Sequence, residues 1–334
     1  MKAFAHLGWT ILAAALLALP LACGGGGGGD GDTTVAASST QVAQALLVTA
    51  AAIDATGTAI DTGTGAVTGS SLPASGVAAA AMGMGGVTPS MHGHFGGMDS
   101  GRGELDLDPT SCDGVDSGTV ATHMQWENLN PETLCVDDLN ATLDLEDCTP
   151  ATGQLMDGQM GMTFTGSTCD PSAIAMDFSG ITVTAPDGTL SGNFIMTMTG
   201  MTFAGDPAEL DITAATFTFD RRMQMAGTGF GTVDMDMDGL AFHFNDATPT
   251  GDLNGTLTVR CNGQAFPMTM ATDANGLTLD ADGNVVAGHM IVTSEGTTHT
   301  VTFNRDGSID VAAGGERVHL ADLADPEAGD FCAL

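Results

Sequence analysis

The chain has 334 residues and a formal net charge of −34, from 41 acidic side chains against seven lysines and arginines. Such a charge repels phosphate backbones and anionic lipid surfaces, which excludes nucleic-acid binding. The sole lysine is Lys2, so the body of the chain has no lysine for a P-loop or for Schiff-base chemistry.

The first residues have the three-part pattern of an export signal. Lys2 supplies a positive charge, and residues 9–21 form an apolar run that is too short for a good membrane span. Small Ala22 then precedes Cys23, and a run of glycines follows. The pattern predicts that the protein is exported.

This pattern resembles the signal peptide of a bacterial lipoprotein. The resemblance implies that residues 1–22 are removed and that Cys23 is lipidated. Because Gly24 rather than Asp follows the cysteine, it also implies sorting to the outer membrane, on its periplasmic or cell-surface side. The alternative is an ordinary secretory signal that is cut near Ala22.

The next segments are predicted to be a tether and a helix. Residues 23–38 are rich in glycine and small polar residues, which is typical of a flexible tether. Over residues 39–62, apolar side chains recur every three or four positions, which predicts a helix capped by Ser39 or Thr40.

Residues 63–102 are predicted to be a low-complexity linker of Gly, Ala, Ser and Met. Thioether and imidazole side chains, which suit copper or another soft metal, gather in it. These side chains are Met82, Met84, Met91, His92, His94 and Met98. The alternative is a linker without a ligand, since methionine is common throughout this chain.

Residues 103–334 form an acidic domain with a β pattern almost throughout. Apolar residues alternate with polar ones, and turn signals come every 8 to 15 residues. No second long helical pattern intervenes, so parallel βαβ units are not expected. The fold class is therefore predicted to be all-β: an antiparallel meander of hairpins that forms a large curved sheet, a sandwich or a partly closed barrel, with one N-terminal helix.

Residues 232–245, TVDMDMDGLAFHFN, are the strongest fold signal. A two-residue loop at Asp238-Gly239 pairs Met237 with Leu240 and puts all apolar side chains on one face, which predicts a hairpin. The stretch also opens like an EF-hand calcium loop, D-x-D-x-D-G. Position 12 of that loop is Asn245 instead of the bidentate Glu, and this favours the hairpin.

The same turn chemistry recurs along the domain. Three-residue loops predict pairing of Leu279 with Val285 and of Phe303 with Ile309, and a further hairpin is predicted at residues 198–201. A degenerate repeat, in which glycine is followed by alternating apolar residues, begins at Gly180, Gly239 and Gly276. Its unequal spacing favours duplicated hairpins in one sheet over a regular solenoid.

The cysteines divide into one at the processing site and an even set of six. In an exported chain an even set predicts three disulfides. The candidates are Cys112, Cys135, Cys148, Cys169, Cys261 and Cys332. Fifteen pairings are possible; Cys135 with Cys169 is favoured because they bracket the open end of a hairpin built from residues 139–145 and 158–164.

No catalytic constellation is found, so an enzyme is not predicted. The histidines are scattered, mostly at polar strand positions, and neither GxSxG nor HExxH occurs. A weak, exposed calcium site is better placed on the turn formed by Asp280, Asp282 and Asn284 than on residues 234–239.

The sequence therefore predicts a non-enzymatic exported protein, anchored to the membrane by lipid, with a structural, adhesive or interaction role toward an envelope partner, and no resident cofactor. The alternative is a binding module. Its ligand is either an apolar molecule held in a half-barrel interior among Met196, Met198, Phe203, Phe217 and Phe219, or metal ions (copper or calcium) held by the Met/His-rich linker and Asp-rich turns.

Overall fold

The computed structural model describes residues 33–46, 49, 102–111, 118–128, 136–148, 155–168, 170–185, 188–204, 211–227, 231–245, 247–280 and 285–320. Their strands are β1 (Thr33–Thr34), β2 (Gly103–Ser111), β3 (Thr119–Glu127), β4 (Asp137–Cys148), β5 (Leu155–Ser167), β6 (Asp170–Ala185), β7 (Gly188–Ala204), β8 (Asp211–Gly227), β9 (Gly231–Asn245), β10 (Thr250–Cys261), β11 (Gln264–Leu279), β12 (Val285–Ser294), β13 (Thr297–Phe303), β14 (Ile309–Ala313) and β15 (Glu316–Leu320).

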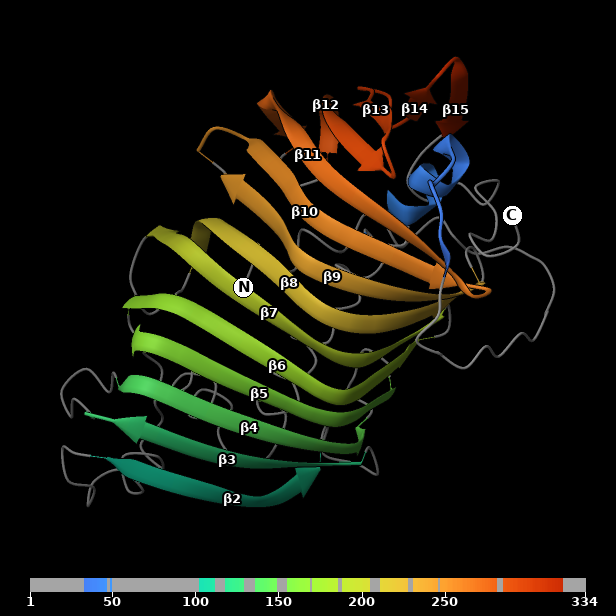
Figure 1. Ribbon diagram of the computed structural model, residues 1–334. Helices are drawn as coiled ribbons and strands as arrows, with labels where there is room; N and C mark the ends of the chain where they lie inside the picture. Colours follow the sequence, from blue (N-terminus) through green and yellow to red (C-terminus); the bar gives the residue numbers. More distant parts are fainter. Residues whose placement is uncertain are drawn as a thin grey trace. The chain divides into compact units, whose positions relative to one another are not determined.

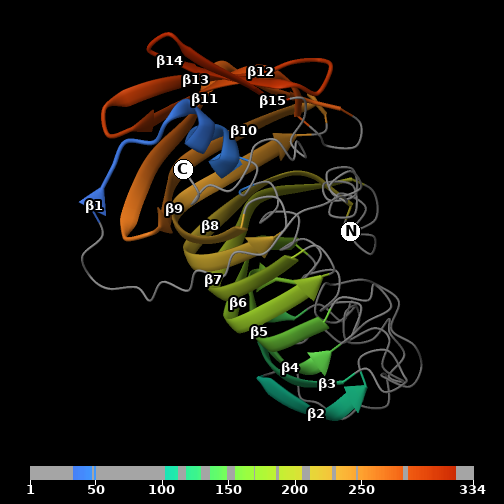
Figure 2. The same cartoon turned by 90° about the vertical axis from the view of Figure 1, so that its right-hand side faces the viewer.

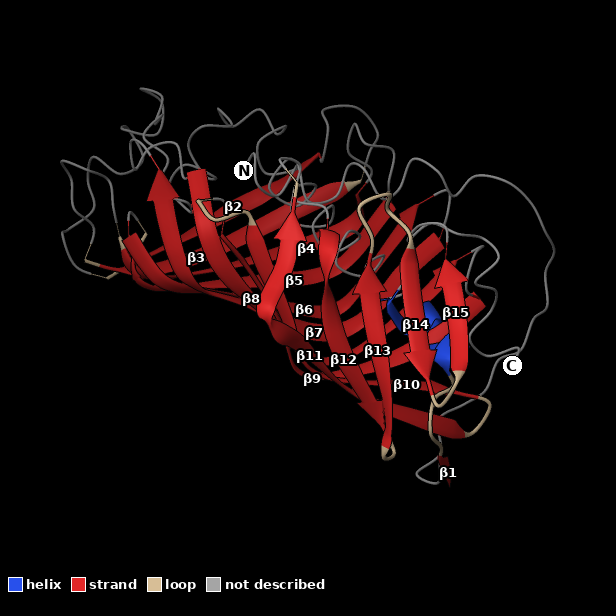
Figure 3. Cartoon of the chain, turned by 90° about the horizontal axis from the view of Figure 1, so that it is seen from above, coloured by secondary structure: helices blue, strands red, loops and turns tan. Residues whose placement is uncertain are grey.

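The strands form one sheet in which each strand lies beside its neighbours in sequence (Figure 1). The order runs from β15 to β2 without a crossover, and β1 is added beside β11. Because the two ends of this order do not pair with each other, the sheet is open. The predicted all-β antiparallel meander is confirmed, and the described residues contain one helical segment, drawn in blue in Figure 3.

The chain divides into two compact units. In the first unit, which contains β2 to β7, apolar side chains alternate with polar ones along each strand. In β4, for example, Leu139, Ala141, Leu143 and Leu145 are buried. Phe178 of β6 stacks on Phe194 of β7, with ring centroids 4.4 Å apart. The core of this unit therefore lies on one face of its strands.

In the second unit, the N-terminal segment covers part of the apolar face (Figure 2). β1 pairs with β11 in parallel, and the amide of Val35 donates to the carbonyl of Ala265 at 2.9 Å. Ser38 and Gln41 form a reciprocal capping box, which starts the helix at residues 39–46. The predicted cap at Ser39 or Thr40 is therefore off by one or two residues.

The end of the predicted tether also differs from the prediction, because residues 33–37 contact β11 and β12 of the sheet. The tether predicted over residues 23–38 therefore extends no further than residue 32. Residues 50–62 of the predicted helix and residues 63–101 of the predicted linker lie outside the described residues. Within the described part of the chain, no helix has the length and apolar character needed to cross a membrane.

The hairpin predicted at residues 232–245 is wrong, because β9 continues through it as a single strand. Gly239, at φ +58°, and Leu240 together lie opposite the single residue Gly255 of β10. This is a β-bulge, and it shifts the side-chain alternation by one residue. Met237 and Leu240 are therefore buried on the same face, as the sequence requires, without a reversal of the chain.

The other glycines of the predicted repeat have the same conformation. Gly180 and Ile181 lie opposite Gly158 in another bulge, and the φ angles of Gly180 and Gly276 are +60° and +74°. Gly200, at φ +62°, lies within the continuous strand β7, so the hairpin predicted at residues 198–201 is also wrong. The repeat glycines therefore lie inside the long strands β6, β9 and β11, of 16, 15 and 16 residues, and not at their ends.

Several predicted pairings are confirmed. Leu279 pairs with Val285, and Phe303 pairs with Ile309. In the hairpin of β4 and β5, Leu145 pairs with Gly158. At the open end of this hairpin, the amide of Thr168 donates to the carbonyl of Val136 at 2.8 Å. The two residues of this last contact directly adjoin Cys169 and Cys135 in the sequence. Their disulfide stays a prediction, because both cysteines lie outside the described residues.

Candidate functional site

The aspartates of β9 form an ion-pair ladder with neighbouring strands. Arg222 of β8 donates to Asp234 at 3.0 Å, and Arg260 of β10 donates to Asp236 at 2.5 Å. Gln224 adds a hydrogen bond to Asp234 at 2.8 Å. Because these carboxylates lie on one extended strand and face arginines, they do not converge as the ligands of an EF-hand do. The resemblance to a calcium loop is therefore confined to the sequence.

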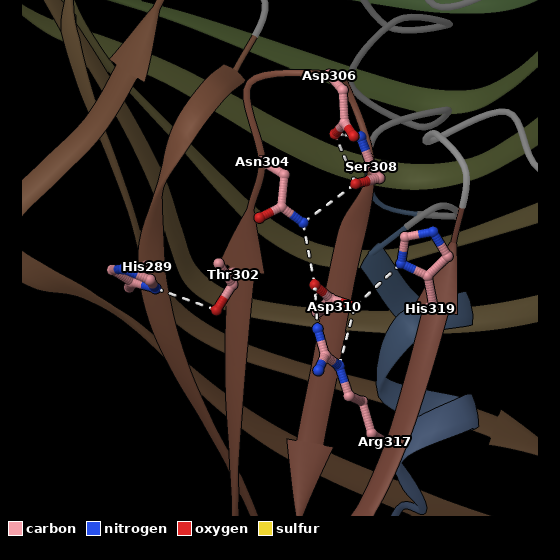
Figure 4. A network of polar contacts seen from close by, with 8 residues as sticks. All are labelled: His289, Thr302, Asn304, Asp306, Ser308, Asp310, Arg317 and His319. Carbon is pink, nitrogen blue, oxygen red and sulfur yellow. Dashed lines mark hydrogen bonds and ion pairs between the residues drawn. The ribbon is translucent and has the colours of Figure 1, made fainter.

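A second polar network joins β13, β14 and β15 (Figure 4). Asp310 accepts hydrogen bonds from both ends of the Arg317 guanidinium, at 3.2 and 2.8 Å, and from the Asn304 amide at 3.0 Å. The His319 ring lies 3.0 Å from the same carboxylate. In the adjacent turn, Ser308 donates to Asp306 from both its amide and its hydroxyl.

This network holds the pKa of Asp310 far below its usual range. The hydrogen bonds from Arg317 contribute most, followed by those from Asn304 and His319. The carboxylate is thus ionised at neutral and at mildly acidic pH. Since the donors of three side chains already fill its oxygens, Asp310 pins the last hairpins together and is not available to a ligand.

A third cluster, on β2 and β3, brings together the side chains of Glu104, Asp106 and His123. Direct pairing of Asp106 with His123 places the carboxylate oxygen 2.5 Å from Nδ1 of the ring. Glu104, two residues earlier on the same face, lies 3.6 Å from Nε2. One ligand atom from each of the three side chains lies within 4.8 Å of the other two, as a metal site requires.

The charge of this cluster suits a cation. The hydrogen bond that the His123 ring donates to Asp106 is the main cause of its raised pKa, to which the charges of both carboxylates also contribute. Arg102, near the start of β2, forms its ion pair with Glu127 at 2.5 Å. Arg102 is thus engaged outside the cluster, whose two carboxylates face His123.

A fourth polar group, His299 of β13, is buried beneath the N-terminal segment. The side chain is 1% exposed, and its Nδ1 lies 3.3 Å from the hydroxyl of Ser39. Its Nε2 is buried and has no hydrogen-bond partner among the described residues. Burial is the main cause of the lowered pKa of His299. The prediction of a surface histidine is wrong for this residue.

The remaining predicted site residues are not brought together by the described structure. Asp280 is half-buried at the end of β11, whereas Asp282, Asn284 and the Met/His group of residues 82–98 lie outside the described residues. Cys23, Cys112 and Cys332 also lie outside them. Cys148 is disulfide-bonded. Cys261 is present as a thiol, which contradicts its predicted disulfide: it ends β10 at a two-residue turn, where it pairs with Gln264.

Among the described residues, the side chains predicted to line an apolar ligand cavity are mostly buried. Met196, Met198, Phe217 and Phe219 are all at least 93% covered, whereas the side chain of Phe203 lies outside the described part. In the second unit, a cavity of about 10 Å³ is lined by Thr49 of the helix and by apolar side chains of β8, β9 and β10. Such a cavity accommodates about one water molecule and no larger ligand.

Two of these sites were accessible to sequence reasoning but were missed. His299 shares its strand parity with Val301 and Phe303, which predicts burial. His123 directly precedes buried Met124, which places it on the polar face, but its partners become apparent only once the register of β2 and β3 is known.

Comparison with known proteins adds no relative: no family model matches this chain, and neither a curated protein nor a solved structure is similar to it.

Proposed function

We propose that this chain is an exported envelope protein, anchored by lipid at Cys23, whose open sheet is a non-enzymatic scaffold for interaction with a partner at the outer membrane. The observation that carries the proposal is the docking of residues 33–46 on the sheet so soon after the cysteine. Nine residues, 24–32, separate Cys23 from β1. An extended chain of that length spans at most about 30 Å.

A short connection of this kind holds a folded body close to the membrane, whereas a long linker would let it move away. The polar face of the sheet supports an interaction role, because its charged side chains are fixed by neighbours. Arg222 and Arg260 hold Asp234 and Asp236, and Arg317 holds Asp310. Such fixed charges select partners by electrostatic complementarity.

The anchor is tested by substitution of Cys23 by serine. We expect wild-type protein to partition with membranes and with the detergent phase, and the Cys23→Ser variant to appear in the aqueous phase, because a serine hydroxyl does not accept the lipid. The measurement is phase partitioning of whole-cell extracts, with Cys261→Ser as a control that also removes one thiol. Membrane association of Cys23→Ser would contradict the anchor.

A second candidate function, binding of a divalent transition-metal ion, is favoured by the cluster on β2 and β3. One imidazole and two carboxylates suit ions such as Zn²⁺, whereas calcium and magnesium prefer oxygen ligands alone. The ligands would be the exposed Glu104 and Asp106 and the half-buried His123. The strong negative charge of the chain raises the local concentration of cations.

This candidate is tested by calorimetric titration of the protein with Zn²⁺. We expect one saturable site whose affinity falls at least about tenfold in His123→Ala, because one of three ligands is lost. His319→Ala is the matched control, since His319 also lies beside a carboxylate, but Arg317 occupies that carboxylate. Equal affinity in His123→Ala and wild type would rule out the site.

A further inference from the structure

The N-terminal segment is attached to the second unit by polar contacts that surround one buried imidazole. The amide of Ala37 donates to the hydroxyl of Ser294 on β12 at 3.0 Å, and both partners are buried. Ser39, fully buried at the first turn of the helix, faces Nδ1 of His299 at 3.3 Å. These contacts join residues that are about 260 positions apart in the sequence.

We propose that residues 33–46 form an acid-sensitive clamp, which the protonation of His299 releases from the sheet. A neutral imidazole uses one nitrogen as a donor and the other as an acceptor. The buried Nε2 has no partner in the described structure, so a proton added there would be a charged donor without an acceptor. Such a group is costly in a dry interior, and it becomes hydrated once the segment leaves.

The charged groups around His299 do not reverse this effect. Residues 33–46 contain no titratable side chain. The backbone of Ala37 and, to a smaller extent, the carboxylate of Glu316 on β15 raise the pKa of His299, but burial, which lowers it, is the larger cause. His289 of β12 is exposed, and Asp310 of β14 is engaged by Arg317 on the polar face.

The direction of the pH effect follows from this lowered pKa. Above the ordinary value of 6.5, both the docked and the released states are neutral, so pH has no effect. Below it, the released state binds the proton more readily than the docked state does. The docked state therefore loses stability as the pH falls from 6.5 toward the lower pKa of the docked form.

Release would change how far the sheet can move from the membrane. With the clamp closed, the nine residues 24–32 connect Cys23 to the sheet; with it open, the 79 residues 24–102 do so. The corresponding maximum lengths are about 30 Å and about 270 Å. This consequence rests on the proposed lipid anchor, whereas the release itself does not and is measured on the protein in solution.

The experiment is hydrogen exchange of the exported chain, followed by mass spectrometry and corrected for the intrinsic effect of pH. We expect exchange of residues 33–46 to be constant between about pH 7.5 and 6.5. Between 6.5 and about pH 5 it should accelerate with a slope that approaches one proton, roughly tenfold per pH unit. The amides of β9 and β13 should remain protected. The proposal would be overturned if the exchange rate of residues 33–46 did not change with pH, or if all of these segments lost protection together.

A matched pair of variants identifies the responsible group. In His299→Gln, which is neutral at every pH, we expect exchange of residues 33–46 to be independent of pH. In His289→Gln, which alters an exposed histidine that contacts Thr302, the wild-type response should remain. If exchange of residues 33–46 still depended on pH in His299→Gln, His299 would not be the responsible group. If that variant fails to fold, the pH slope of exchange in the wild-type protein tests the proposal.

Discussion

Replacement of Gly255 by alanine is expected to destabilise the second unit by at least about 3 kcal/mol, or to prevent its folding. Gly255 has φ +132°, a conformation that residues with a side chain almost never adopt. An added Cβ would overlap the carbonyl oxygen of Gly239 and would lie 2.6 Å from the Cα of Leu240. Backbone atoms cannot move aside as a flexible side chain can, so the bulge itself must be distorted.

The other glycine of the same bulge is the matched control. Gly239, at φ +58°, has no atom within 4 Å of its added Cβ, so Gly239→Ala bears only the backbone cost of about 1–2 kcal/mol. The measurement is denaturant unfolding followed by far-ultraviolet circular dichroism. Equal stability of the Gly255→Ala and Gly239→Ala variants would mean that the bulge is not built as described.

Replacement of Phe178 by alanine is expected to destabilise the first unit by about 3–5 kcal/mol. The side chain is fully buried and stacks on the equally buried Phe194. Truncation removes its apolar surface from the core, leaves a cavity and also removes the ring–ring contact, which is worth about 0.5–1.5 kcal/mol.

Trp126 is a convenient reporter for this experiment, because it is buried in the first unit and the sole other tryptophan is Trp9, in the predicted export signal. We expect the free energy of unfolding, measured by Trp126 fluorescence, to fall in Phe178→Ala. In Ser179→Ala, which alters an exposed neighbour on β6, it should stay within about 0.5 kcal/mol of the wild-type value. An unaltered midpoint in Phe178→Ala would show that the ring pair does not hold this unit together.

Much of the fold follows from the alternation of apolar residues and from turn chemistry. The wrongly predicted hairpin at residues 232–245 has a specific cause. A two-residue hairpin loop and a β-bulge both shift the apolar parity by one residue. The parity of Met237 and Leu240 is thus satisfied equally by a reversal at Asp238-Gly239 and by a bulge at Gly239. The two structures can be distinguished only by the strand that pairs with this stretch. In the structure that strand is β10, where Gly255 lies opposite the bulge.

The sites were less predictable, because they depend on pairing and on coverage. The trio on β2 and β3 needs the register that sets Asp106 against His123. The environment of His299 needs the docking of Ser39, 260 positions earlier in the chain. A turn such as residues 304–308 could be predicted because its determinants are local: Gly307 donates to Asn304, and Phe303 and Ile309 face each other across it.

The clamp also bears on the order in which the chain acquires its structure. Each strand of the meander pairs with strands adjacent in sequence, so hairpins form by closing short loops. Residues 33–46 are synthesised before the strands of the meander, yet β1, Ala37 and Ser39 find their partners on β11, β12 and β13. Docking of this segment must therefore follow the formation of β11, β12 and β13. A docked segment thus indicates that these late strands have been synthesised and have folded.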